Sequence, residues 1–224
     1  MELGPRLIDV RVPREPKGAV LLLHGGASRR GSMRVSPTQL SVLRMIPIAG
    51  RVARAGRGRL AVFRLLNSRR GWNTDHTPVD DAEWALSEVA KRFGEALPVC
   101  LIGHSLGGRA ALLAAGQPAV RSVVALAPWV YPTDVVAQDG RRILIVHGTQ
   151  DRIASQSRSL ALARTLSRSA EIGYVSVEGG KHAMLRHHAV FDRLAAEFAV
   201  TTLLGTPPAG ALARIAAGEQ LVTV

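Results

Sequence analysis

The stretch that most constrains the fold of this chain lies at residues 99–115. Val99-Cys100-Leu101-Ile102 is a continuous apolar run that predicts a short buried strand, and the alanine-rich segment 109–115 predicts a helix ended by Gly116. Gly103-His104-Ser105-Leu106-Gly107-Gly108 joins the two. A turn this tight strains the backbone of its central residue, so it needs small residues two positions before and after that residue. It presents Ser105 just ahead of a helix N-terminus, whose free N–H groups and dipole favour negative charge.

The motif Gly-His-Ser-Leu-Gly-Gly at residues 103–108 resembles the signature of the α/β-hydrolase superfamily. Within it, the chain resembles the serine esterases and lipases, and the lidless members similar to dienelactone hydrolase. The resemblance covers roughly residues 6–200. It also rests on His24-Gly25-Gly26 and on Asp151 with His182. It implies an α/β-hydrolase fold in which Ser105 is the nucleophile.

A serine hydroxyl is a poor nucleophile at neutral pH and needs a base beside it, most suitably an imidazole. The chain has seven histidines: His24, His76, His104, His147, His182, His187 and His188. His182 follows the strand predicted at 172–177 through a loop with two glycines, beyond a carboxyl strand end, where open α/β sheets place their sites. The resemblance implies the catalytic histidine at the same place. We assign the base to His182, with His187 and His188 as alternatives. His104 and His147 are expected to have structural roles in the turns where they lie.

The third member of such a site orients the imidazole and stabilises the imidazolium. His147-Gly148-Thr149-Gln150-Asp151 resembles the His-Gly-x-x-Asp turn of the family, which implies that Asp151 is this acid. Asp134 is the alternative acid, and Asp151 could instead cap the helix predicted at 155–168. The order Ser105, Asp151, His182 is the order of the α/β hydrolases.

The resemblance also implies an oxyanion hole made of two backbone N–H groups. One belongs to Leu106, the residue after the nucleophile. The other is assigned to Gly26, in the turn that follows the apolar run at 19–23. Ala27 stands where the full His-Gly-Gly-Gly form of this turn has its last glycine. His24 itself is interpreted as a structural residue.

The rest of the chain alternates between apolar runs and amphipathic segments. Strands are expected at residues 7–12, 19–23, 60–66, 99–102, 122–127, 142–146 and 172–177. Helices are expected at 37–55, 77–93, 109–115 and 155–168, and in a last segment with the apolar positions Met184, Phe191, Leu194 and Phe198. Pro47 either kinks the first helix or marks its start. The alternation predicts one α/β domain over residues 1–224, a mainly parallel sheet with helices on both faces and a tail at 205–224.

Residues 128–141 connect two predicted strands at the point where many α/β hydrolases insert a helical cap. This connection is too short for a cap, so we expect no cap domain and an open cleft. It contains Trp129 and Tyr131, and Trp72 lies in another polar loop. These three aromatic residues are expected to form a shallow wall that binds the acyl part of the substrate.

Composition limits the partners of the chain. The formal net charge is +12, from 29 Lys and Arg against 17 Asp and Glu, so a nucleic-acid partner must be considered. The arginines are spread along the whole chain, and aromatic residues make up only 4%, too few for extensive base stacking. No apolar run approaches the roughly 18 residues that span a membrane. We therefore expect no nucleic-acid partner and no stable membrane insertion; because residues 1–15 lack the apolar core of a secretory signal, we expect a cytoplasmic protein.

Cofactor motifs are missing from the sequence. The single cysteine, Cys100, cannot form an internal disulfide and is expected in the core. There is no Cys-x-x-Cys, His-Glu-x-x-His or carboxylate cluster for a metal, and no Gly-x-Gly-x-x-Gly for a dinucleotide. We expect neither a metal nor another cofactor.

The function that the resemblance implies is hydrolysis of small-molecule carboxylic esters by a serine hydrolase with a Ser-His-Asp triad. A thioesterase, a peptidase or an acyltransferase would use the same triad, since the fold does not determine the substrate. A ligand-binding protein on a hydrolase scaffold, with little turnover, is the alternative from another class.

Overall fold

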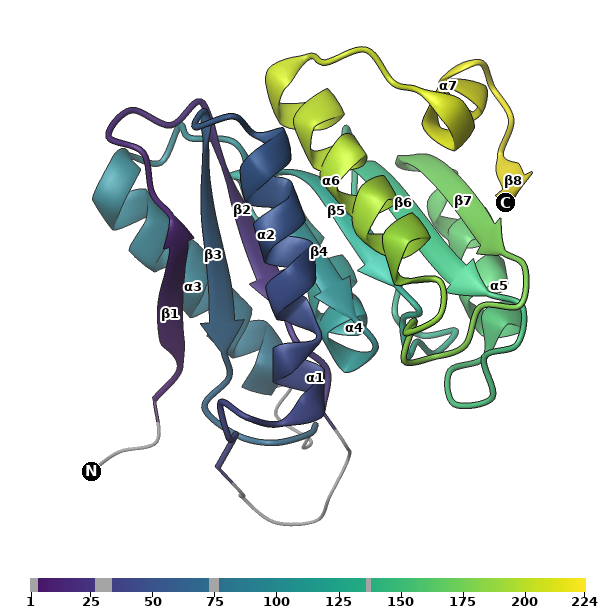
Figure 1. The fold of residues 1–224 in the computed structure, drawn as a ribbon, viewed down its shortest axis with the longest axis horizontal. Coiled ribbons are helices and arrows are strands. Elements are labelled where there is room, and N and C mark those ends of the chain that lie inside the picture. The colour runs from purple at the N-terminus through teal and green to yellow at the C-terminus, as the bar shows by residue number, and fades with distance from the viewer. Residues whose placement is uncertain (1–3, 27–33, 73–76, 136–137) are drawn as a thin grey trace.

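The computed structural model describes residues 4–26, 34–72, 77–135 and 138–224. Its centre is an eight-stranded sheet with the strand order β1-β3-β2-β4-β5-β6-β7-β8 (Figure 1). The strands are β1 (Arg6–Arg11), β2 (Gly18–Leu23), β3 (Leu60–Leu66), β4 (Val99–His104), β5 (Val120–Leu126), β6 (Arg142–Gly148), β7 (Glu171–Val177) and β8 (Leu221–Thr223). Every pairing is parallel except that of β1 with β3.

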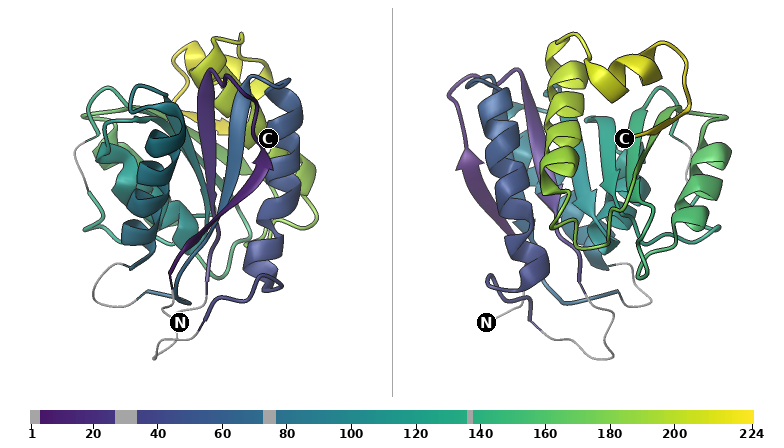
Figure 2. Two further views of the ribbon diagram at one scale, coloured as in Figure 1. Left: turned by 90° about the vertical axis from the view of Figure 1, so that its left-hand side faces the viewer. Right: turned by 45° about the vertical axis from the view of Figure 1, so that its right-hand side comes forward.

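Helices cover both faces of the sheet (Figure 2). One face carries α1 (Leu40–Leu43), α2 (Met45–Ala55), α6 (His188–Leu204) and α7 (Gly210–Ala216); the other carries α3 (Thr77–Phe93), α4 (Leu106–Leu113), the 3₁₀ turn η1 (Ala114–Gly116) and α5 (Gln156–Leu166). The central strands are apolar throughout because successive side chains enter opposite layers. In β2, Leu21 and Leu23 pack under α3 and α4, whereas Val20 and Leu22 pack under α2 and α6. The predicted fold class is confirmed.

Two predicted helices differ in detail from the structure. The helix expected at 37–55 is divided at Arg44 into α1 and α2. Pro47 is the third residue of α2, where a missing N–H costs no helical hydrogen bond. The placement of Met184 on the last helix is wrong: Met184 lies in the turn before α6 with φ +58°, and its side chain is buried in the same apolar layer. Met184 fitted the apolar pattern of the last helix because its side chain is buried, although its backbone is not helical.

The sheet has one strand that the sequence analysis did not expect, and it lies in the tail at residues 205–224. The segment after Gly205 forms α7 and then β8, which pairs in parallel with β7. Ala211, Leu212 and Val222 are buried. A strand of three residues is too short to show a period in the sequence, so the edge of the sheet was not predicted.

The carboxyl ends of the parallel strands meet at the lower edge of the view in Figure 1. The described part of the connection between β5 and β6 consists of turns and has no helix. The loops of this edge are therefore left without a cap domain. Among the described helices, none is long and apolar enough to cross a membrane.

Candidate active site

Ser105 lies between β4 and α4 in a strained conformation, with φ +56° and ψ −119°. A side chain at Gly103 would overlap the backbone of Gly107, and one at Gly107 would overlap the backbone of Leu23. The glycines therefore let the turn pack against itself and against the end of β2. The strain directs the Ser105 hydroxyl away from its own chain and toward the loops at the carboxyl edge.

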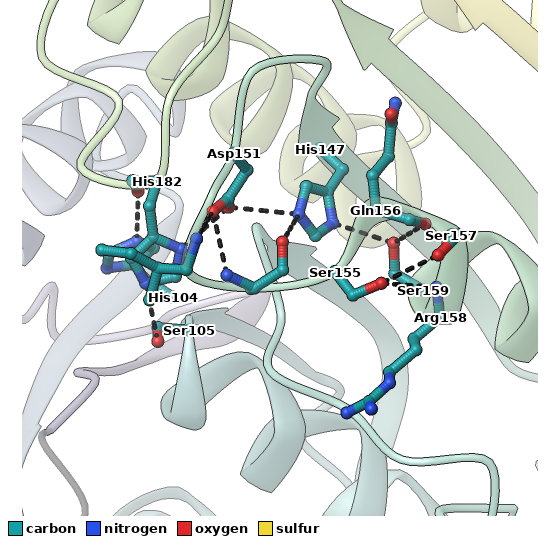
Figure 3. Close-up of polar contacts among 12 residues, drawn as sticks. His104, Ser105, His147, Asp151, Ser155, Gln156, Ser157, Arg158, Ser159 and His182 are labelled. Carbon is teal, nitrogen blue, oxygen red and sulfur yellow. Dashed lines mark hydrogen bonds and ion pairs between the residues drawn. The ribbon is translucent and has the colours of Figure 1, made fainter.

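The structure brings His182 and Asp151 to this serine in one line of hydrogen bonds (Figure 3). Nε2 of His182 lies 3.0 Å from Oγ of Ser105, and Nδ1 of His182 lies 2.8 Å from Oδ2 of Asp151. Both distances suit hydrogen bonds. Nδ1 must carry a proton because it faces a carboxylate, so Nε2 is free to accept the proton of the serine hydroxyl.

The Asp151 carboxylate accepts four hydrogen bonds. Oδ1 accepts from the backbone N–H groups of Ile153 at 2.8 Å and Ala154 at 2.9 Å. Oδ2 accepts from His182 and, at 3.1 Å, from Nε2 of His147. Burial by itself would raise the pKa of Asp151, but the hydrogen bonds from His147, His182 and Ile153 outweigh it and hold the pKa well below its usual range. Asp151 is therefore an anion at physiological pH.

The loops that carry Asp151 and His182 are tied to each other. The Gly179 N–H donates to Oγ1 of Thr149 at 2.9 Å, and the Gln150 N–H donates to the carbonyl of Gly180 at 2.9 Å. A side chain at Gly148 would overlap the backbone of Gly180. The two loops thus pack backbone on backbone, which sets the distance between acid and base.

His104 has a role that the sequence did not reveal. Its Nε2–H donates to the carbonyl oxygen of His182 at 2.9 Å, and the two rings lie 5.1 Å apart. Burial lowers the pKa of His104 to about 3, so the ring is neutral at physiological pH. The residue before the candidate nucleophile therefore holds the loop of the candidate base.

The other histidines take structural places. His24 donates from Nδ1 to the carbonyl of Gly25 at 2.6 Å and accepts at Nε2 from the Asn67 N–H at 3.1 Å, which agrees with its structural interpretation. Burial lowers the pKa of His24. His187 precedes α6, and His188 faces Asp192 at 3.9 Å rather than Ser105. His76 lies outside the described residues.

Asp134, the alternative acid, is engaged elsewhere. Its two carboxylate oxygens accept from Nε and Nη2 of Arg109 at 2.8 and 2.7 Å, and Oδ2 also accepts from the Tyr131 N–H at 2.8 Å. This bidentate pair is almost fully buried. Asp134 fixes the loop after β5 to α4, and the carboxylate beside His182 is that of Asp151.

Of the two residues assigned to the oxyanion hole, Leu106 follows Ser105 directly, and Gly26 follows the glycine that lies over Ser105. Leu106 is the first residue of α4, so its N–H has no partner within the helix. The turn after β2 passes over the serine: a Cβ on Gly25 would lie 3.1 Å from the Cβ of Ser105. Gly26 follows it and packs against Gly71. Ala27 lies outside the described residues.

Two of the three aromatic residues assigned to the substrate wall, Trp72 and Tyr131, contact Arg109, and the third, Trp129, contacts Tyr131. Its guanidinium lies 4.2 Å from the ring centroid of Trp72 and 4.8 Å from that of Tyr131. Nε1–H of Trp129 donates to the Tyr131 hydroxyl at 3.2 Å, and the Trp129 N–H donates to the carbonyl of Ser105 at 3.1 Å. Tyr131 is 39% exposed. Cation–π contacts with Arg109 thus hold these aromatic rings together beside Ser105. The sequence did not indicate that Arg109 belongs to this cluster.

Among the described residues, no group of three or more His, Cys, Asp or Glu side chains is arranged to hold a metal ion. Cys100 is buried in β4, and burial raises the pKa of its thiol to about 12. It is a core residue and no thiolate nucleophile.

Comparisons with known proteins agree with the fold. The model of the alpha/beta hydrolase family matches residues 83–190. Est1E from Butyrivibrio proteoclasticus, solved with bound ferulic acid, has 15% sequence identity and a TM-score of 0.65, over 89% of this chain and 96% of its own. XC6422 from Xanthomonas campestris, described as a serine hydrolase without lid, has 20% identity and a TM-score of 0.64, over 91% and 90%. The esterase domain of a Rhodothermus marinus protein has 18% identity and a TM-score of 0.60, over 86% and 90%. No curated protein sequence matches the chain. The resemblance to the α/β hydrolases is confirmed, and the described residues form the α/β-hydrolase fold with no cap domain among them.

Proposed function

We propose that this chain, with its α/β-hydrolase fold, is a serine hydrolase that cleaves small carboxylic esters through an acyl-enzyme. The observation that carries the proposal is the 3.0 Å approach of His182 Nε2 to Oγ of Ser105, with Nδ1 of the same ring on Asp151. A nucleophile, a base and an orienting acid are then within hydrogen-bond reach of one another. The esterases among the structural neighbours support the same chemistry.

Acylation begins with Ser105. Its oxygen forms a bond to the acyl carbon while Nε2 of His182 takes the hydroxyl proton. The carbonyl oxygen becomes an oxyanion, which the N–H groups of Leu106 and Gly26 stabilise. The tetrahedral intermediate then breaks its bond to the alcohol oxygen, which leaves with the proton from His182.

Deacylation repeats the steps with water. His182 takes a proton from the water as the water oxygen attacks the acyl carbon, and the proton then passes to Oγ of Ser105 as the acid leaves. Asp151 stays ionised throughout, because its four hydrogen bonds stabilise the anion. Its task is to keep the proton on Nδ1 and to stabilise the imidazolium.

The substrate side of the proposal rests on the aromatic residues Trp72, Trp129 and Tyr131. With no cap domain, they supply an apolar surface for an acyl group that reaches Ser105 from solvent. A structural neighbour binds ferulic acid, an aromatic acid. The panel that identifies the acyl group therefore contains linear esters, thioesters and feruloyl esters.

A fluorophosphonate probe tests the central claim, because only an activated serine reacts with it quickly. We expect the wild type to become labelled at Ser105 and the Ser105→Ala variant to remain unlabelled. Ester hydrolysis by the variant should fall by several orders of magnitude at an unchanged melting temperature, because the covalent route is lost. Labelling at another residue, or wild-type turnover by Ser105→Ala, would contradict the proposal.

A further inference from the structure

A second imidazole contacts the same carboxylate oxygen as His182. His147 is the second-last residue of β6, is completely buried, and places Nε2 3.1 Å from Oδ2 of Asp151 (Figure 3). His182 reaches that oxygen at 2.8 Å from the side of Ser105. The carboxylate of Asp151 therefore lies between two imidazoles, one facing the site and one facing the core.

The surroundings of His147 determine which of its nitrogens carries the proton. Nε2 faces two acceptors, Oδ2 of Asp151 and the carbonyl oxygen of Ala154 at 3.2 Å. A nitrogen between two acceptors must be protonated, so Nε2–H is a donor. This donor reaches Asp151 without exposing the carboxylate to water.

The other side of the ring is closed by a hydroxyl pair. Nδ1 of His147 lies 2.8 Å from Oγ of Ser159, and that oxygen lies 2.9 Å from the hydroxyl of Tyr174. Burial raises the pKa of Tyr174 to about 12, so its hydroxyl keeps its proton and can donate to Ser159. Oγ of Ser159 also lies 2.9 Å from the carbonyl oxygen of Gln156, so its proton has two acceptors within reach, that carbonyl and Nδ1 of His147. Figure 3 shows this line of contacts running from Asp151 into α5.

We infer that His147 is a positioning residue that acts through Asp151: its Nε2–H holds Oδ2 in place and reduces the charge with which Asp151 attracts the proton of His182. The inference rests on the proposed function of the Ser105 site. It does not place His147 in contact with substrate. Two N–H donors on one carboxylate oxygen share its negative charge, so loss of one strengthens the interaction with the other.

The sign of the effect follows from this sharing. Without the His147 donor, Asp151 attracts the Nδ1 proton of His182 more strongly and stabilises the imidazolium form of that ring. The acidic limb of kcat/KM therefore moves to higher pH. The other ionisable groups near His182 are His104 of β4 with Arg44 behind it, and Lys181 and His187 of the same loop. None of them changes in the variants below.

The variants His147→Phe and His147→Gln distinguish the effect of the N–H donor from the effect of the ring. Phe keeps a ring of similar shape but has no N–H, whereas Gln places an amide N–H at the same number of bonds from the backbone as Nε2. We expect His147→Phe to move the Nδ1–H proton resonance of His182 downfield, because its hydrogen bond to Asp151 strengthens. It should also shift the acidic limb of kcat/KM to higher pH by roughly 0.5 to 1 unit and lower kcat about 10-fold. His147→Gln should restore most of each value. Ser159→Ala, which loosens the surroundings of His147 but leaves its donor, should lower stability and leave the His182 resonance unchanged.

An unchanged His182 resonance in His147→Phe, or equal effects of Phe and Gln, would overturn the inference and leave His147 as a packing residue. A test on the unaltered chain needs no variant: ¹⁵N NMR of the histidines should show a proton on Nε2 of His147, and a proton on Nδ1 alone would also overturn the inference. These NMR measurements need no substrate. A chain that shows the change in the His182 resonance but no reaction with the fluorophosphonate would reject the proposed function and retain the coupling of the two imidazoles.

Discussion

Nε2 of His104 lies 2.9 Å from the carbonyl oxygen of His182. This bond joins the turn of the candidate nucleophile to the loop of the candidate base, which are 78 residues apart in the chain. It needs only the Nε2–H of a neutral ring. The same burial that keeps His104 neutral makes the fold sensitive to acid.

The free energy of unfolding should fall as the pH drops below about 6.5, the pKa of histidine in an unfolded chain. Folded His104, whose pKa burial lowers to about 3, takes up no proton in that range, whereas the unfolded chain does. Unfolding is then coupled to proton uptake, so stability is complete above the unfolded pKa and is lost between the two values. Urea unfolding of the wild type and His104→Gln at pH 7.5 and 5 measures the effect.

The Gln variant keeps an N–H donor for His182 but does not titrate. We expect it to lose about 2 kcal/mol less than the wild type between these pH values. Burial also lowers the pKa of His24, which remains in the variant and retains part of the pH dependence. Equal losses in the two proteins would show that His104 is not the titrating group.

Asp151→Asn should lower kcat by about four orders of magnitude, because the amide favours the wrong tautomer of His182. Asp134→Asn is the matched control, since it alters the other carboxylate considered for the same role. It should reduce kcat far less. It should cost roughly 3 kcal/mol of stability, because it leaves the nearly buried Arg109 without its carboxylate. Rates of ester hydrolysis and thermal unfolding of both variants measure these effects. If Asp134→Asn lowered kcat more than Asp151→Asn did, the role of the orienting acid would pass to Asp134.

Gly107→Ala should prevent the turn at Ser105 from closing, because the added methyl group would overlap the carbonyl of Leu23. We expect loss of the native thermal transition or a fall of several kcal/mol in stability. Gly50→Ala in α2 is the control: its Cβ meets nothing within 4 Å, and alanine in a helix should stabilise the chain by about 0.5 to 1 kcal/mol. A fully stable Gly107→Ala protein would reject the close approach of the turn to β2.

The length of the acyl chain should affect kcat/KM only up to a limit. Each methylene group buried against Trp72, Trp129 or Tyr131 contributes at best roughly 0.8 kcal/mol, about fourfold in kcat/KM. The gain ends when the chain outgrows this aromatic wall, since no cap domain covers the rest. In a series of linear esters of increasing chain length, kcat/KM should therefore rise and then level off, without activation by micelles. An optimum on long-chain or micellar esters would show that another part of the chain encloses the substrate.

Much of the fold could be read from the sequence, because local rules determine it. Continuous apolar runs predicted the buried parallel strands, since both faces of the sheet are covered. The glycines around Ser105 predicted the strained turn, since no other residue fits there. Short or irregular pieces were less readable: β8 has too few residues for a period, and Met184 is buried in a turn rather than on a helix.

The sequence by itself determined which residues are candidates for the site: Ser105 by its turn, and Asp151 and His182 by their places after strands. Only the tertiary structure decided that Asp151 rather than Asp134 meets His182, that His104 and His147 support the pair, and that Arg109 joins the three aromatic residues. The end of the chain, just after β8, also contacts this region: the Glu178 N–H, just before the His182 loop, donates to the carbonyl of Val224. The tertiary structure decided this contact too. The physical reason is range: strand periodicity and turn strain act between near neighbours in the chain, whereas these contacts join segments that only the packed sheet brings together.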